Sequence, residues 1–237
     1  MQRVTMEPAY VLHARPYRET SSLLEVFTPD HGRMGLVARG ARAGRSRWKN
    51  LLQPFRPLLV SWYQRGELGT LTAAEQVASP PAAQGQALFC GLYVNELLIR
   101  ALHRADAQPE LFEAYRGLLG KLASHIDPEP ALRVFEKQLL DALGYGMQLE
   151  CECDTGVPVS ATAWYDWMPE RGLVRRIPVA EATDATSNAK LISGEALLAL
   201  QSDQIEAGHL NELKRLMRRV LRYHLGDRPL VSQSLFR

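Results

Sequence analysis

The hydrophobic period of this chain changes at Ser79-Pro80-Pro81, and this change constrains the fold more than any other feature. Before these residues, apolar side chains come in short alternating stretches, which are typical of β-strands. Beyond them, apolar side chains recur every three or four residues, as in amphipathic helices. Adjacent prolines fit neither a helix interior nor a central strand. Because 237 residues suffice for two small domains, we place a boundary here, between residues 1–80 and 81–237, and predict an α+β protein.

The first part predicts five short strands, at residues 9–13, 22–28, 33–38, 57–62 and 70–76. Turn-forming residues separate the strands, among them Pro29-Asp30-His31-Gly32. A small closed barrel accommodates five such strands without exposed edges. The residues between the third and fourth strands then form a long connection.

The second part predicts a mostly helical domain. Apolar periodicity indicates helices over residues 88–99, 111–122, 129–143, 194–201 and 210–224, with Ser193 as an N-cap. Residues 147–190 lack a helical period and contain several prolines. We interpret them as an irregular insertion with strand-like pieces at 163–167 and 173–177.

Positive charge is concentrated in the connection between the third and fourth predicted strands. Residues 39–49, here called the cationic segment, contain five cations, one tryptophan and no carboxylate: Arg39, Arg42, Arg45, Arg47, Trp48 and Lys49. Residues 1–80 hold eleven Lys and Arg against six Asp and Glu, whereas residues 81–237 hold seventeen against twenty. A polyanion should therefore meet the N-terminal part first. A solvated surface loop is the alternative interpretation.

We hypothesise that the cationic segment, with Arg33 and Arg56 on the adjoining barrel face, holds nucleic-acid phosphates without reading sequence. In this hypothesis Trp48 offers a face on which bases stack. The last predicted helix carries a second basic surface: Lys214, Arg215, Arg218, Arg219 and Arg222. An amphipathic core helix with a soluble outer face would show the same pattern.

Signatures of catalysis and of metal binding are missing from the sequence. No His-Glu-x-x-His, Gly-x-Ser-x-Gly or phosphate-loop motif occurs, so we expect neither an enzyme nor a cofactor. Cys151 and Cys153 lack the further nitrogen or sulfur ligands of a zinc site, and with Cys90 they form an odd set that suits reduced thiols. No apolar run approaches membrane-spanning length, so we expect a cytoplasmic protein.

Several motifs distributed over the whole chain are specific in combination. They occupy residues 10–28, 31–42, 52–59, 91–98, 130–136, 143–146 and 228–237, and include Gly91-Leu-Tyr-Val-Asn-Glu-Leu-Leu and Leu143-Gly-Tyr-Gly. Together they resemble the RecO family of bacterial recombination mediators. The resemblance implies an N-terminal OB-fold barrel followed by a helical domain.

The resemblance also implies a function in recombinational repair. A family member would bind single- and double-stranded DNA, anneal complementary strands, and with RecR help RecA replace the single-stranded-DNA-binding protein; it would be associated with the nucleoid. Some members hold zinc through four cysteines after the third helix. This chain keeps only Cys151 and Cys153 there, so it is similar to the zinc-free members.

Members of this type also bind the acidic C-terminal tail of the single-stranded-DNA-binding protein on the helical domain. Such a partner-tail site needs an apolar pocket rimmed by cations. Our candidates for the rim are Arg116, Lys121, Arg133 and Lys137. Two other functions stay open: a protein adaptor that does not bind DNA, and a zinc-dependent nucleic-acid hydrolase.

Overall fold

A computed structural model of the chain describes residues 2–79, 83–124, 127–178 and 190–232. These residues form two compact units, which we call the first unit (residues 1–126 with 229–237) and the second unit (residues 127–228). The predicted boundary at Pro80-Pro81 lies outside the described residues, as do parts of the predicted insertion and of the C-terminal motif. The first two helices group with the N-terminal strands, and a domain boundary at residue 80 stays a prediction.

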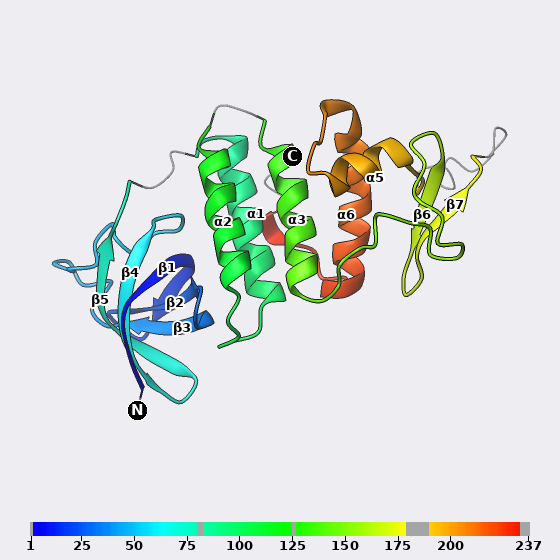
Figure 1. The fold of residues 1–237 in the computed structure, drawn as a ribbon. Coiled ribbons are helices and arrows are strands. Elements are labelled where there is room, and N and C mark those ends of the chain that lie inside the picture. The colour runs from blue at the N-terminus through cyan, green and yellow to red at the C-terminus, as the bar shows by residue number, and fades with distance from the viewer. Residues whose placement is uncertain (1, 80–82, 125–126, 179–189, 233–237) are drawn as a thin grey trace. The chain divides into compact units, whose positions relative to one another are not determined.

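The first unit contains the five-stranded barrel that the sequence predicts (Figure 1). Its strands are β1 (Gln2–Tyr17), β2 (Ser21–Thr28), β3 (Gly32–Ala38), β4 (Leu58–Arg65) and β5 (Leu68–Gln76). They close in the order β1-β2-β3-β5-β4. β3 pairs with β5 in parallel, and the other neighbouring strands pair antiparallel.

β1 closes the barrel because it pairs with two partners along its length. Its first half pairs with β4 and its second half with β2, and the register shifts between Val4 and Glu7 and again between Val11 and His13. Such irregularities bend a strand. The bend lets one sixteen-residue strand join both sides of the ring. Each half of β1 therefore has one strand partner, and the two halves together complete the ring.

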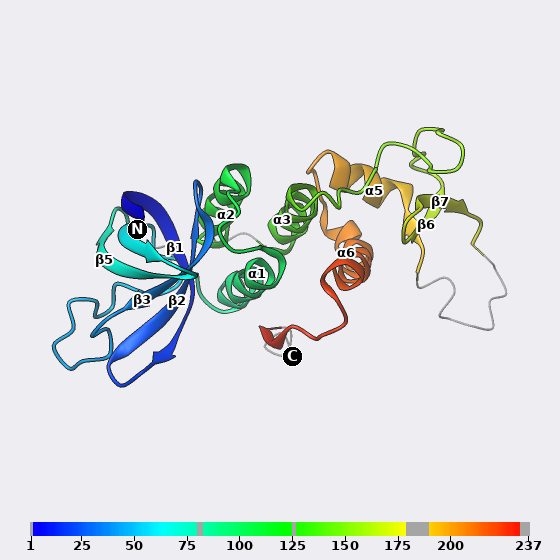
Figure 2. The same ribbon diagram turned by 90° about the horizontal axis from the view of Figure 1, so that it is seen from below.

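Among the residues that the structure describes, two α-helices complete the first unit. α1 (Gln86–Ala101) and α2 (Pro109–Leu122) lie side by side (Figures 1 and 2). Both were predicted from the apolar period. Gly85 and Pro109 mark their N-terminal ends.

A buried polar network joins these helices to the barrel. The Asn95 side chain on α1 donates a hydrogen bond of 2.9 Å to the carbonyl of Leu12 on β1, and the Tyr115 hydroxyl donates one of 2.6 Å to the Asn95 side-chain oxygen. The rings of Tyr10 and Phe112 lie 5.5 Å apart beside it. Burial raises the pKa of Tyr115 well above its ordinary value, so the hydroxyl stays a donor. The barrel and the two helices are thus joined through buried polar and aromatic contacts.

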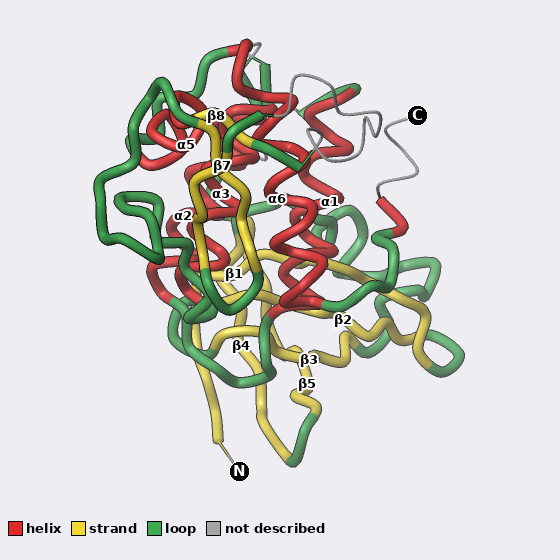
Figure 3. Tube along the Cα trace, turned by 90° about the vertical axis from the view of Figure 1, so that its right-hand side faces the viewer, coloured by secondary structure: helices red, strands yellow, loops and turns green. Residues whose placement is uncertain are grey.

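In its described residues, the second unit combines three α-helices with a small sheet: α3 (Glu129–Ala142), β6 (Trp164–Met168), β7 (Gly172–Arg176), β8 (Ile192–Ser193), α5 (Gly194–Gln201), a 3-10 turn η1 (Ala207–His209) and α6 (Leu210–Leu225). The sheet has the order β7-β6-β8, and Figure 3 shows β6 and β7 as a hairpin in yellow. The predicted helices and strand-like pieces are confirmed. Ser193 is the N-cap of α5, as its hydroxyl accepts a hydrogen bond of 3.2 Å from the Ala196 amide.

Candidate nucleic-acid interface

The cationic segment lies in the connection between β3 and β4, and its five cations point to solvent. Every one of them is exposed: Arg39, Arg42, Arg45, Arg47 and Lys49. Within the described part of the chain, none forms an ion pair with a carboxylate. Their charges are therefore available to an anion from solution.

Hydrogen bonds hold the cationic segment at two places on the barrel. The amide of Arg42 donates to the carbonyl of Thr20 at 2.8 Å, and its guanidinium donates to the carbonyl of Arg18 at 3.3 Å. The guanidinium of Arg47 donates to the carbonyl of Thr72 on β5 at 3.0 Å. These contacts are made with carbonyl oxygens, so they position the arginines without neutralising them.

The prediction that Trp48 offers a stacking face to bases is wrong. Its side chain is only 5% exposed and belongs to the barrel core beside Leu36 and Leu58. The indole nitrogen donates to the carbonyl of Arg39 at 3.1 Å, and the Arg47 guanidinium covers the ring at 4.1 Å from its centroid. Burial of a large aromatic ring is more favourable than its exposure. Trp48 therefore anchors the cationic segment to the barrel.

Arg33 and Arg56, the two predicted barrel-face cations, differ from the exposed group. Arg33 pairs with Glu25 at 3.5 Å, and Arg104 contacts the same carboxylate at 2.5 Å. Burial lowers the pKa of the Arg33 guanidinium, and Glu25 opposes this effect. Arg56 donates to the side chains of Gln53 and Gln76, which are neutral. Arg56 thus keeps an uncompensated charge, whereas Arg33 is already paired.

Most cations of the second basic surface have carboxylate partners inside the second unit. Lys214 pairs with Glu129 at 2.7 Å and Arg219 with Asp166 at 2.9 Å, and Arg222 pairs with Asp227. The opposite side of α6 is buried through Leu213, Leu216, Met217, Val220 and Leu221. Arg215 and Arg218 are exposed and lack ion pairs among the described residues. The pairing pattern favours the interpretation of α6 as an amphipathic core helix.

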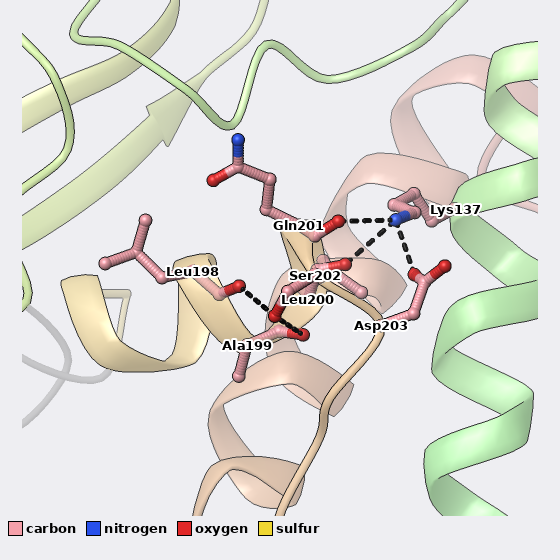
Figure 4. A network of polar contacts seen from close by, with 7 residues as sticks. All are labelled: Lys137, Leu198, Ala199, Leu200, Gln201, Ser202 and Asp203. Carbon is pink, nitrogen blue, oxygen red and sulfur yellow. Dashed lines mark hydrogen bonds and ion pairs between the residues drawn. The ribbon is translucent and has the colours of Figure 1, made fainter.

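Two residues of the predicted partner-tail rim have structural partners in the second unit. Arg133 has a side chain 4% exposed and pairs with Glu136 at 3.0 Å, so it does not lie on a rim. The ammonium of Lys137 donates to the carbonyls of Leu200 and Gln201 and pairs with Asp203 at 2.5 Å (Figure 4). It binds the C-terminal end of α5. The sequence period alone does not distinguish such a cation from a surface charge.

The other two rim candidates lie on α2, in the first unit. Arg116 pairs with Glu113 one helical turn earlier, while Lys121 is exposed and lacks an ion pair in the described ranges. The four candidates therefore belong to different compact units. Of these four, Lys121 keeps its charge uncompensated.

The two neighbouring cysteines lie in a turn that packs on β7. The Cys153 amide donates to the carbonyl of Leu173 at 2.9 Å, and its thiol donates to Asp154 at 3.4 Å. Arg171 pairs with Asp154 at 2.8 Å. Across the described ranges, no group of three or more His, Cys, Asp or Glu is placed to hold a metal ion. Cys90 is buried within α1.

The fold and this site together define a class of protein: an N-terminal five-stranded OB-type barrel that carries an exposed cationic connection, followed by a largely helical C-terminal region. A family model described as "Recombination protein O N terminal" matches residues 1–80, and a second, "Recombination protein O C terminal", matches residues 82–234. The chain belongs to the RecO family of DNA repair proteins.

Relatives with this name are similar along nearly their whole length. The DNA repair protein RecO of Nitrosococcus oceani is 45% identical over 98% of this chain and 93% of its own length. The RecO of Methylococcus capsulatus is 47% identical over 99% and 94%, and that of Pseudomonas aeruginosa is 45% identical over 100% and 96%. Among the described residues, no helix is long and apolar enough to span a membrane.

Proposed function

We propose that this protein is a recombination mediator that binds single- and double-stranded DNA without sequence specificity and anneals complementary strands. The observation that carries the proposal is the row of five exposed cations on the cationic segment, each without a carboxylate partner among the described residues. The protein holds and hands over strands and catalyses no bond chemistry.

Charge of this kind suits backbone contact. Each phosphate neutralised by Lys or Arg releases condensed counterions, which favours binding and makes it salt-dependent. Phosphate contacts fix the position of a strand but carry no sequence information. A protein that must anneal any pair of complementary strands needs this independence from sequence.

The proposal includes three protein partners and a place in the cell. With RecR, the protein helps to load RecA on DNA that is coated by the single-stranded-DNA-binding protein, and it contacts the C-terminal tail of the latter. Membership of the RecO family supports these proposed partners. The site of action is the cytoplasmic nucleoid, where such DNA is found.

Replacing Arg42, Arg45, Arg47 and Lys49 together with alanine tests DNA binding. Since each phosphate contact on a single strand contributes about 0.7 to the slope of log affinity against log salt, the slope should fall by about 3. Fluorescence anisotropy of a labelled oligo-dT over a series of NaCl concentrations measures it. Unchanged affinity at low salt would contradict the proposal.

A matched control removes four cations elsewhere. Alanine at Lys121, Arg215, Arg218 and Arg222 changes the net charge by the same amount, at exposed positions outside the cationic segment. We expect a much smaller change in slope. An equal change in both variants would mean that overall charge, and not the cationic segment, determines binding.

Strand annealing separates the mediator from the adaptor. The purified protein alone should accelerate the annealing of two complementary oligonucleotides, measured by quenching between end labels. An adaptor that does not bind DNA would leave the rate at that of the strands alone. The quadruple alanine variant of the cationic segment should lose most of the acceleration.

A further inference from the structure

The aromatic side chains of the barrel leave few places where a base can stack. Residues 2–79 are all described and contain seven phenylalanines, tyrosines and tryptophans, of which five are buried: Tyr10, Phe27, Trp48, Phe55 and Trp62. The other two, Tyr17 and Tyr63, are half-buried. Each of these two residues is therefore partly accessible to solvent.

Tyr17 is distinguished from Tyr63 because the turn that follows it is hydrogen-bonded to the cationic segment. It ends β1, and it pairs with Ser21 across the β1–β2 turn. The carbonyls of Arg18 and Thr20 in this turn accept the two hydrogen bonds from Arg42. In the described part of the chain, no hydrogen bond or ion pair joins Tyr63 to the cationic segment. A strand held by the exposed cations therefore passes next to the Tyr17 turn.

The turn holds Arg18 in an unusual conformation. Its φ of 53° lies in the left-handed region, which side chains other than Asn, Asp and Gly rarely adopt. The Arg18 guanidinium lies over the Tyr17 ring, 5.2 Å from its centroid. Strained residues of this kind are found at ligand-binding sites more often than elsewhere. Glu19 in the same turn is exposed and repels phosphate, so the turn suits bases better than the backbone.

We propose that Tyr17 and Arg18 form a stacking subsite for an unpaired nucleobase, beside the phosphate-binding cationic segment. This inference rests on the proposed DNA binding and specifies its ligand as single-stranded nucleic acid. Aromatic rings and guanidinium planes both stack on bases irrespective of sequence. A base in a duplex has both faces covered by its neighbours, so duplex DNA gains phosphate contacts but not this one. The subsite makes the protein favour single strands.

The Tyr17→Leu variant tests the subsite, because leucine keeps an apolar residue at the end of β1 and removes the ring. We expect affinity for oligo-dT to fall roughly tenfold, as for loss of one stacked base, and affinity for a duplex of equal length to stay within about twofold. Equal losses on both DNA forms, or no loss on either, would overturn the inference.

Tyr63→Leu is the matched control. Tyr63 is also half-buried on the barrel and also lies under an arginine, since the Arg3 guanidinium is 5.6 Å from its ring centroid. Unlike those of Tyr17, its neighbours in sequence make no hydrogen bond with the cationic segment in the described ranges. We expect this variant to bind oligo-dT like the unmodified protein, and a loss equal to that of Tyr17→Leu would contradict the inference.

An abasic strand distinguishes failure of the subsite from failure of the proposed function. Such a strand keeps the phosphates and lacks the bases, so the unmodified protein should bind it more weakly than oligo-dT, and Tyr17→Leu should bind the two nearly alike. If the unmodified protein binds neither DNA, the proposed function fails. If it binds both equally, only the stacking subsite fails.

A fluorescent variant tests the subsite if Tyr17→Leu folds poorly. The Tyr17→Trp variant places an indole at the turn, and stacking with a base should quench its fluorescence when oligo-dT is added, relative to the unmodified protein. Tyr63→Trp should show no such quenching. Absence of quenching in Tyr17→Trp at saturating DNA would overturn the subsite.

Discussion

At the residue scale, burial determines whether a cation can meet an external anion. Arg116 and Arg133 each pair with a glutamate three residues away on the same helix, but the Arg116 side chain is 63% exposed whereas the Arg133 side chain is 4% exposed. Surface pairs of this kind contribute little because water and salt screen them. A buried charge depends on its partner.

Replacing Arg133 with methionine should therefore destabilise the second unit by about 3–5 kcal/mol, because Glu136 keeps its charge without this partner in a buried site. Urea unfolding, followed by circular dichroism, measures the change. Arg116→Met is the control and should cost at most about 1 kcal/mol. Similar values for the two variants would contradict this account.

The sequence indicated the cationic segment but could not separate its exposed members from its buried one. A run of cations favours solvent, and so all of residues 39–49 were expected there. Trp48 departs from this rule because its ring fills the barrel core, against which Ala41 also packs, while the cations of the segment remain exposed. The partners of Arg33, Arg133 and Lys137 come from the tertiary fold, about which local spacing says little.

At the element scale, α5 depends on side chains at its two ends. The helix has eight residues, which is too short to be stable in isolation. Ser193 satisfies an amide at its start, and Lys137 from α3 contacts the carbonyls at its end (Figure 4). A cation at that end also interacts favourably with the negative pole of the helix dipole.

Lys137→Met should loosen α5 and lower the free energy of unfolding by about 2 kcal/mol, since hydrogen bonds to a charged group are lost. Hydrogen exchange should show faster exchange in residues 194–201, while α1 and α2 keep their protection. Lys121→Met, at an exposed position, should change neither quantity by a comparable amount. If the protection of α5 in Lys137→Met equals that in the unmodified protein, the contact is dispensable.

The periods in the sequence predicted the strands and helices well, because each element buries one side and repeats its apolar residues accordingly. The largest departure is β1, which begins at Gln2 and not at residue 9. Its first half contains Glu7 and Pro8 and shifts register at this point. The alternating pattern is interrupted there, so the sequence predicted only residues 9–13, most of which belong to the half that pairs with β2.

At the scale of the whole molecule, the C-terminal segment returns to the first unit. The carboxylate of Glu96 on α1 accepts hydrogen bonds of 2.8 Å from the amides of Val231 and Ser232, and one of 2.6 Å from the Ser232 hydroxyl. Burial of the Glu96 carboxyl raises its pKa, but the hydrogen bonds from Ser232 and Val231 outweigh burial and hold the pKa below the ordinary 4.5.

A carboxyl with a lowered pKa in the folded state stabilises the fold above its unfolded pKa and loses this effect as the pH falls through the folded value. The free energy of unfolding of Glu96→Gln should therefore lie below that of the unmodified protein at pH 7. The difference should shrink as the pH falls below 4.5. Urea unfolding at several pH values measures it.

Glu75→Gln is the control for this series. Glu75 is exposed, and among the described residues its side chain has no hydrogen-bond or ion-pair partner. Its difference from the unmodified protein should be small at every pH. A pH-independent deficit in Glu96→Gln would instead indicate that the amide side chain disturbs the packing of the C-terminal segment.

The contact of Glu96 with Ser232 can form only late during synthesis on the ribosome. The first unit contains residues at both ends of the described chain, and the whole second unit is synthesised between them. At roughly 5–20 residues per second, about 5–20 s pass between synthesis of α2 and of residue 229. During this interval the barrel and its two helices have been synthesised, but Glu96 still lacks its partners Val231 and Ser232. Val231 and Ser232 therefore complete a unit whose other described residues were synthesised first.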